Sequence, residues 1–187
     1  EFLVEERPTT TINGSISYGT SVGLVGGIKL ADTNFLGRGQ EASLNLEASN
    51  KGDKTFDISW FDPWIRNTER IQAGASVYWR ETVDDDAGPL DVEKVKRIGT
   101  RWTIGKGLND KIYVRLSARY DHYKEILGSK QINDKYNLIA ITPSLIYDSR
   151  DNSFAPTKGI YSTLTYEKGD LIKDKRKYDQ FEADLRA

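Results

Sequence analysis

The stretch Ala42-Ser43-Leu44-Asn45-Leu46-Glu47-Ala48 alternates strictly between apolar side chains at even positions and polar side chains at odd positions. Successive side chains of a β-strand point to opposite faces, so this pattern predicts a strand with one apolar and one polar face. Residues 56–60 keep the same parity, and residues 71–80 and 112–119 repeat the alternation. Only 37% of the chain is hydrophobic. An apolar face this large in so polar a chain indicates that it contacts lipid.

The alternation recurs between turn-rich segments along almost the whole chain. It predicts an all-β, transmembrane, antiparallel meander β-barrel with about ten strands here. Each strand is near the length that a tilted membrane strand needs. Arg115 and Arg119 then share the polar face, which cannot be the lipid face. We expect strands near residues 11–20, 22–33, 40–50, 53–62, 68–81, 95–106, 110–123, 135–148, 159–168 and 177–187.

The overall composition excludes several classes of protein. The 187 residues contain 27 Lys+Arg and 28 Asp+Glu, so the chain has no electrostatic footprint for nucleic acid. No stretch approaches eighteen consecutive apolar residues, which excludes a transmembrane helix. The absence of cysteine rules out disulfides and thiolate zinc sites. What remains is one domain, or part of a larger sheet.

The connections between the predicted strands fall into two alternating sets. In one set, three connections are long and highly charged, namely residues 82–94, 124–134 and 169–176. The other set is rich in Gly, Pro, Asn and Asp, at residues 34–39, 62–67, 105–110 and 148–158. Outer-membrane barrels show this asymmetry, with long loops outside and short turns facing the periplasm.

Residues that could carry enzyme chemistry do not gather in the sequence. His122 is the only histidine and stands next to a predicted loop, so we expect it to be solvated rather than part of a triad or zinc site. Asp148, Arg150 and Asp151 have a spacing that suits turn capping and ion pairing rather than a metal site. We therefore expect no enzyme activity, no cofactor and no metal.

Aromatic residues gather near both ends of the predicted strands. Such positions predict belts at the two membrane interfaces, although ordinary aromatic packing in a core would also explain them. Pro63 stands where a strand must stop. One expected belt contains Trp60, Phe61 and Trp64, and the opposite belt contains Tyr78, Trp79, Tyr120 and Tyr123.

Several short motifs follow one another along the chain in an order that is typical of one family. They are Val4-Glu5-Glu6-Arg7-Pro8-Thr9, a hairpin with Gly14, Tyr18, Gly19 and Gly23, then Asn34-Phe35-Leu36-Gly37-Arg38-Gly39, Asp62-Pro63-Trp64, Tyr147-Asp148-Ser149-Arg150-Asp151-Asn152 and Pro156-Thr157-Lys158-Gly159. In this order they resemble the first part of the barrel of BamA-type outer-membrane assembly factors.

This resemblance implies a domain arrangement and a location. Residues 1–9 would end a periplasmic POTRA domain or linker, and residues 10–187 would be the front portion of a larger, sixteen-stranded barrel in the bacterial outer membrane. The family's late Val-Arg-Gly-Phe motif and aromatic-ended last strand are missing. Either the remaining strands lie outside this sequence, or the sheet closes on itself or pairs with a second copy. The implied periplasmic turn motifs contain Asn34, Phe35, Gly37, Gly39, Asp62, Pro63, Trp64, Asp148, Arg150, Asp151, Pro156, Thr157 and Gly159.

The resemblance also implies a function for the first strand. Five glycines crowd the first hairpin, where they weaken packing and ease bending; alternatively, they only line a crowded inner wall. In the family the first strand forms a lateral seam that templates a client strand by β-augmentation. By resemblance, the backbone groups that pair with the client belong to Ile12, Asn13, Gly14, Ser15, Ile16, Ser17 and Tyr18.

The expected function is therefore assembly of client β-barrel proteins into the outer membrane. Its partners would be outer-membrane lipid and those clients, with periplasmic assembly lipoproteins or a second copy of the chain as further candidates, and no nucleic acid. Two alternatives stay open at this point. One is a polypeptide secretion pore of the two-partner or patatin-type autotransporter kind, and the other is a soluble β-sandwich with a ligand groove.

Overall fold

A computed structural model describes residues 8–66, 68, 70–83, 92–127, 132–152, 155–172 and 176–186. All regular structure in these residues is β-strand. The strands are β1 (Thr10–Gly19), β2 (Gly23–Phe35), β3 (Gln40–Ser49), β4 (Lys54–Asp62), β5 (Ile71–Val83), β6 (Val92–Gly107), β7 (Ile112–Leu127), β8 (Ile132–Asp148), β9 (Tyr161–Leu171) and β10 (Arg176–Arg186).

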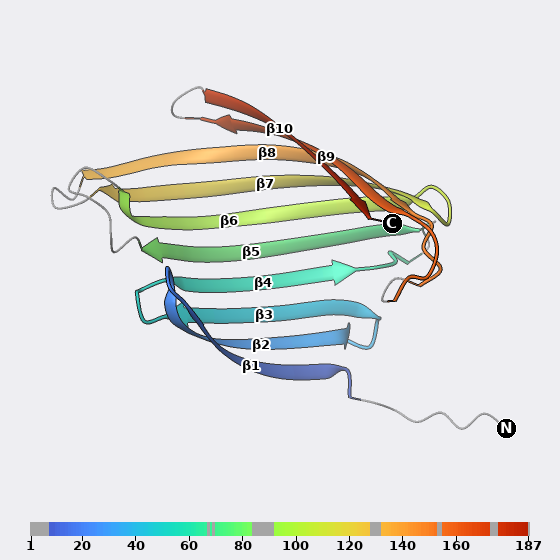
Figure 1. Cartoon of the computed structure of the whole chain (residues 1–187), viewed down its shortest axis with the longest axis horizontal. Helices are drawn as coiled ribbons and strands as arrows, with labels where there is room; N and C mark the ends of the chain where they lie inside the picture. Colours follow the sequence, from blue (N-terminus) through green and yellow to red (C-terminus); the bar gives the residue numbers. More distant parts are fainter. Residues whose placement is uncertain are drawn as a thin grey trace.

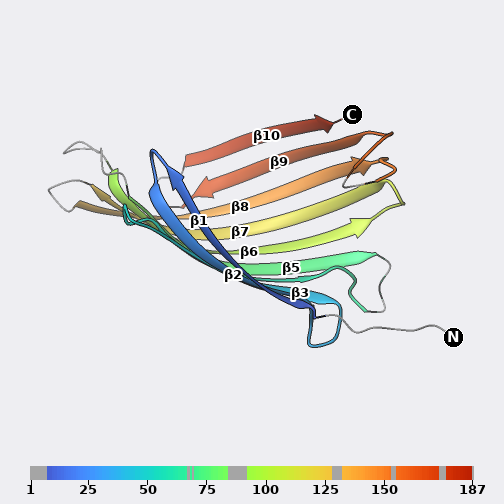
Figure 2. The same cartoon turned by 60° about the horizontal axis from the view of Figure 1, so that its bottom comes forward.

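The ten strands form one sheet in which the spatial order is the chain order. Each strand pairs antiparallel with its sequence neighbours. The sheet is curved and open, with β1 at one edge and β10 at the other (Figures 1 and 2). No helix long and apolar enough to cross a membrane occurs in the described part of the chain. The predicted all-β antiparallel meander is confirmed.

The two sets of connections lie at opposite rims of the sheet. The turns after β2, β4, β6 and β8 lie on the right of Figure 1, on the same side as the N-terminus. We call this side the turn rim, and we call the opposite side, where β1 meets β2 and β3 meets β4, the loop rim. The segregation expected from the sequence is therefore confirmed, and it places the turn motifs together.

Strands β6, β7 and β8 extend further into the loop rim than predicted, starting or ending at Val92, Leu127 and Ile132 rather than at residues 95, 123 and 135. Charged residues had suggested loops there, but cross-strand pairs hold these residues in strands. The rings of Tyr123 and Tyr136 stack with centroids 4.8 Å apart, and the Tyr136 hydroxyl donates to Glu125 at 2.6 Å.

The two faces of the sheet differ as the alternation predicts. One lateral row joins Leu44, Ile58 and Val77 through direct register, and Ile58 and Val77 are 48% and 52% exposed. No second sheet covers this outward face in the described residues, so it is not the interior of a sandwich. On the inward face, Ser43 bonds Ser59 at 2.7 Å, and Thr103 bonds Ser117 at 3.0 Å.

Candidate functional site

The free edge of β1 is the first candidate site, because this strand pairs only with β2 in the described sheet. The register runs without a bulge from Thr10 opposite Asp32 to Gly19 opposite Gly23. The predicted seam residues 12–18 therefore all lie in one regular edge strand. An unpaired edge presents a row of N–H and C=O groups to any strand that approaches it.

Two backbone hydrogen bonds determine which β1 amides face the open edge. The amide of Thr33 donates to the carbonyl of Thr9, so odd positions of β1 bond toward β2. The amide of Asn50 donates to Leu24, so even positions of β2 bond toward β3, which agrees with that assignment. Since bonded and non-bonded pairs alternate in an antiparallel ladder, the N–H and C=O groups of Ile12, Gly14, Ile16 and Tyr18 point to the open edge.

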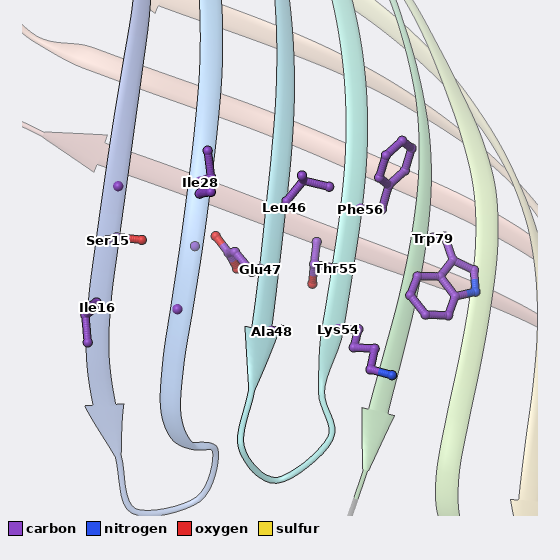
Figure 3. A pocket seen from close by; sticks show the side chains of 13 residues that line it. Ser15, Ile16, Ile28, Leu46, Glu47, Ala48, Lys54, Thr55, Phe56 and Trp79 are labelled. Atoms are coloured by element: carbon purple, nitrogen blue, oxygen red, sulfur yellow. The ribbon is translucent and has the colours of Figure 1, made fainter.

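The side chains of the same even positions point outward. Ile12, Ile16 and Tyr18 are 72%, 83% and 75% exposed. Beside them lies an open hollow of about 1180 Å³, whose apolar wall includes Ile28, Leu46, Phe56 and Trp79 (Figure 3). The β1 edge therefore combines free backbone groups with an apolar outward surface.

The glycines of the first hairpin serve different purposes. A Cβ at Gly14 or Gly26 would meet nothing within 4 Å, so these two positions simply lack side chains on the outward face. A Cβ at Gly27 would lie 2.8 Å from the Ser15 hydroxyl, so this inward glycine is needed for close packing. Gly27 therefore fits the interpretation of a crowded wall, and an easily bent first strand stays a prediction.

The predicted turn motif at residues 34–39 is built by its glycines and Asn34. Gly37 and Gly39 have φ angles of 69° and 68°, which glycine adopts readily. The Asn34 side chain accepts the amide of Gly39 at 2.7 Å, and its carbonyl accepts the amide of Gly37 at 2.8 Å. Phe35 is the last residue of β2.

The next turn begins at Asp62, the last residue of β4. Its carboxylate accepts the amide of Trp64 at 2.9 Å and the side-chain amide of Gln40 at 2.8 Å. Pro63 lies between them, outside the strand, as the sequence predicted. The Trp64 indole donates to the carbonyl of Thr68 at 3.2 Å. This turn is therefore fixed by its own polar groups and by a tie to β3.

The connection from β8 to β9 contains the predicted ion-pair cluster. Arg150 donates two bonds to the Asp148 carboxylate, at 2.9 and 2.8 Å, and this raises the pKa of Arg150. Asp151 accepts the hydroxyl and amide of Thr157 and the amide of Lys158, which lowers its pKa to about 2. Pro156 is exposed beside Thr157.

Gly159 completes this connection. Its φ is 101°, and a Cβ there would lie 2.3 Å from the carbonyl oxygen of Ser149. No group of three or more metal-ligating side chains occurs in the described residues. The cluster is thus organised as a folded turn.

Three aromatic predictions were wrong, because Tyr78, Tyr123 and Phe61 lie on the inward face. Tyr78 lies on the inward face and is only 3% exposed, because it shares the parity of Ser76 and Arg80 rather than that of Trp79. Tyr123 also lies inward, where the guanidinium carbon of Arg97 is 5.3 Å from its ring centroid. Both rings pack over the polar face and therefore cannot contact lipid.

The predicted outward parity is found for Trp60, Trp79 and Tyr120, while Trp64 lies in the turn after β4. Trp60 is half-buried and donates to Gln40 at 3.3 Å, Trp64 is 64% exposed, and Trp79 is half-buried. Tyr120 is 43% exposed on the same face. Phe61 differs, because it shares the inward parity of Ser59 and packs beside Gly74, within 3.2 Å of where a Cβ would stand.

The inward face carries a charged network that the sequence did not predict. Asp121 is fully buried and accepts two bonds from Arg97, at 2.9 and 2.8 Å, and one from the Tyr78 hydroxyl. Arg119 bonds Glu167 at 2.7 Å. Only the shared inward parity of Arg115 and Arg119 hinted at it. The partners belong to strands far apart in sequence.

His122 is more constrained than predicted. It lies half-buried on the outward face, with Nδ1 2.7 Å from the Asn137 side-chain oxygen. This contact joins β7 to β8, where the two residues are direct register partners. The single histidine is therefore a cross-strand partner rather than a freely solvated side chain.

Comparison with known proteins agrees with this arrangement. Residues 34–187 match the model of the Omp85 superfamily domain, which is most of the chain. The chain belongs to the Omp85 superfamily. The match covers β3 to β10 in full and the turn motifs from Asn34 onward, and β1 lies outside it.

Two of the proteins that the chain resembles are BamA proteins. The chain is 27% identical over 166 residues to the outer membrane protein assembly factor BamA of Neorickettsia risticii, which covers 85% of this chain and 22% of that protein. Its fold is similar to that of BamA from Haemophilus ducreyi lacking POTRA domains 1-3, with a TM-score of 0.73 and 17% identity over 97% of this chain and 37% of that one.

The lengths of these relatives explain why the described sheet is open. The chain spans 22% and 37% of the two relatives' lengths, and it corresponds to part of the Omp85 barrel. The BamA-type resemblance seen in the sequence is confirmed for the barrel portion. The assignment of residues 1–9 to the end of a POTRA domain stays a prediction, since residues 1–7 lie outside the described residues.

Proposed function

We propose that this protein assembles client β-barrel proteins into the bacterial outer membrane, with β1 as the strand on which the client is paired. The observation that carries the proposal is the edge of β1, where the backbone groups of residues 12, 14, 16 and 18 have no partner in the described sheet. The outer-membrane location is supported by the Omp85 match and by the exposed apolar outward face.

The physical basis of the proposal is that backbone N–H and C=O groups need hydrogen-bond partners inside a membrane. Each unpaired N–H or C=O group costs several kcal/mol in hydrocarbon, so a client strand gains by pairing with an edge that already lies at membrane depth. Pairing through main-chain groups accepts clients of many sequences. The hollow beside Gly26 leaves the outward surface near β1 thinly covered, which favours easy separation of this strand from a temporary partner.

The test places proline at a position whose N–H group faces the open edge of β1. Ile16→Pro removes one edge donor while leaving the bonds to β2, and Ile16→Ala removes only the side chain. The readout is the fraction of an outer-membrane β-barrel protein that becomes protease-protected in vesicles containing the full chain or its variants. We expect Ile16→Pro to slow insertion severalfold and Ile16→Ala to leave it nearly unchanged. Equal insertion by the Ile16→Pro variant and the parent would refute the role of the β1 edge.

Crosslinking gives a second, direct test. The chain has no cysteine, so Gly14→Cys introduces a single thiol at an outward position with open space around it. A client with one cysteine in a terminal strand should form a disulfide with this variant during insertion. A cysteine at Gly37, in the turn rim, is the matched control and should not crosslink.

A secretion pore is the competing function. Vesicles that fail to gain inserted client but deliver a soluble polypeptide into their lumen would support it instead.

A further inference from the structure

A lateral row of charged side chains crosses five strands at the loop rim. Direct register places Lys54 on β4 beside Glu81 on β5, Glu81 beside Lys96 on β6, Lys96 beside Lys124 on β7, and Lys124 beside Lys135 on β8. We call these five residues the lysine row. The row contains four cations and one carboxylate, in a chain whose net charge is −1.

The lysine row lies on the outward face. Lys54 has the parity of Phe56 and Ile58, and the next row toward the middle of the sheet is Phe56, Trp79 and Ile98. Figure 3 shows Lys54 at the start of β4, with Phe56 farther along the strand and Trp79 on the neighbouring strand. Two residues of a strand span roughly 7 Å, so the charges stand within one such step of the apolar band.

The charges of the row are poorly compensated. Glu81 pairs with Lys96 at 3.1 Å and with Lys94 at 2.9 Å, so its carboxylate is shared. Lys54, Lys124 and Lys135 have no ion pair in the part of the chain that the structure describes. Like charges directly opposite each other destabilise a sheet, and this row contains two such pairs in succession.

The described strands β4 to β8 carry no similar row at the turn rim. There the corresponding outward row from β4 to β8 reads Asp62, Ala73, Ile104, Leu116 and Pro143, with a single lysine, Lys106, one step further out. Among the described outward strand positions from β4 to β8, lysines therefore stand side by side on neighbouring strands only at the loop rim.

We propose that the lysine row binds the phosphate groups of membrane lipids in the leaflet around the loop rim. Neighbouring strands lie about 4.8 Å apart, so a phosphate between two of these lysines contacts both and offsets their repulsion. The acyl chains of the same lipid then cover the apolar band below. The inference rests on the membrane placement in the proposed function but does not depend on client assembly.

The test titrates the full chain in neutral detergent with dioctanoyl phosphatidylglycerol or dioctanoyl phosphatidylcholine and counts bound lipid by native mass spectrometry. The parent should prefer the anionic lipid. The combined variant Lys96→Gln, Lys124→Gln and Lys135→Gln should lose more than about tenfold in affinity for it. The matched control Lys106→Gln, Lys111→Gln and Lys158→Gln, which removes the same charge from the turn rim, should bind like the parent.

Several outcomes would overturn the proposal. They are unchanged affinity in the lysine-row variant, equal loss in the turn-rim control, or displacement of the lipid by an equal concentration of inorganic phosphate, which would make the row a general anion site. Flotation with phosphatidylcholine vesicles separates the two proposals. A parent that enters those vesicles but shows no anionic preference refutes the lysine row alone, and a parent that never enters them refutes the membrane placement as well.

Discussion

The Tyr78 side chain on β5 lies beside Gly99, its register partner on β6, and its hydroxyl donates a hydrogen bond to Asp121 on β7. A Cβ on Gly99 would stand 2.2 Å from an Asp121 carboxylate oxygen and 2.8 Å from the Tyr78 ring. Tyr178 covers Gly169 in the same way at the β9–β10 pair. Glycine thus makes room for the rings that tie the inward face together.

We therefore expect Gly99→Ala to lower the free energy of unfolding by about 1–3 kcal/mol, since the added methyl group displaces the ring or the carboxylate. Urea unfolding in detergent, followed by tryptophan fluorescence, measures this. Gly26→Ala is the matched control, because a Cβ there meets nothing within 4 Å. A control variant as unstable as Gly99→Ala would contradict the packing argument.

Asp121→Asn should be more damaging. The change removes the only full negative charge that Arg97 contacts among the described residues, and Arg97 is itself only 19% exposed. Breaking one partner of a buried ion pair costs about 3–5 kcal/mol. Asp57→Asn provides the comparison, because its contact with Arg80 is longer, at 3.9 Å, and its side chains are more exposed, at 25% and 47%, so that it contributes less than about 1 kcal/mol. Similar losses in both variants would show that the buried network is not special.

The hydrogen-bond assignment of β1 predicts alternating effects of proline. Ser15 bonds toward β2, so Ser15→Pro should raise amide exchange throughout β1 and β2, whereas Ile16→Pro should leave the β2 amides protected. Hydrogen exchange detected by mass spectrometry, with coverage of residues 10–35, makes the comparison. Equal deprotection by the two prolines would mean that the edge amides are assigned wrongly.

The turn at Asp151 predicts a specific pH dependence. Its pKa is lowered from 3.8 to about 2 by the bonds from Thr157 and Lys158, so the ionised form is favoured in the folded turn. The stabilisation is complete above pH 3.8 and disappears as the pH falls through about 2. The difference in thermal midpoint between the parent and Asp151→Asn should therefore be constant near neutral pH and shrink toward pH 2. A constant difference down to pH 2 would exclude this carboxylate as the cause.

The meander and its two faces could be predicted because alternation is local. Residues 42–48 and 56–60 specify their own faces, and the turn motifs at Asn34 and Asp62 specify where strands stop. The prediction of Tyr78 in a membrane-interface belt followed from its residue type, whereas its parity with Ser76 puts it on the inward face. The charged residues near the loop rim likewise predicted loops where β6 to β8 continue as strands, because cross-strand pairs rather than local strand propensity maintain these ends.

The inward network and the lysine row could not be predicted in the same way. Asp121 meets Arg97 and Tyr78 only through the registers of two different strand pairs. The four lysines of the row are spread over residues 54 to 135 and become neighbours only when four registers hold at once. Register depends on turn length and on packing across strands, and the sequence pattern of a single strand specifies neither of them.

The identity of spatial and chain order has a consequence for how such a sheet arises. Every strand of the described sheet pairs only with its neighbours in sequence, so this sheet can grow hairpin by hairpin from either terminus, at low loop-closure cost. Gain or loss of one whole hairpin at an end also leaves every other pairing intact. The hairpin is therefore the natural unit by which barrels of this kind change their circumference during evolution.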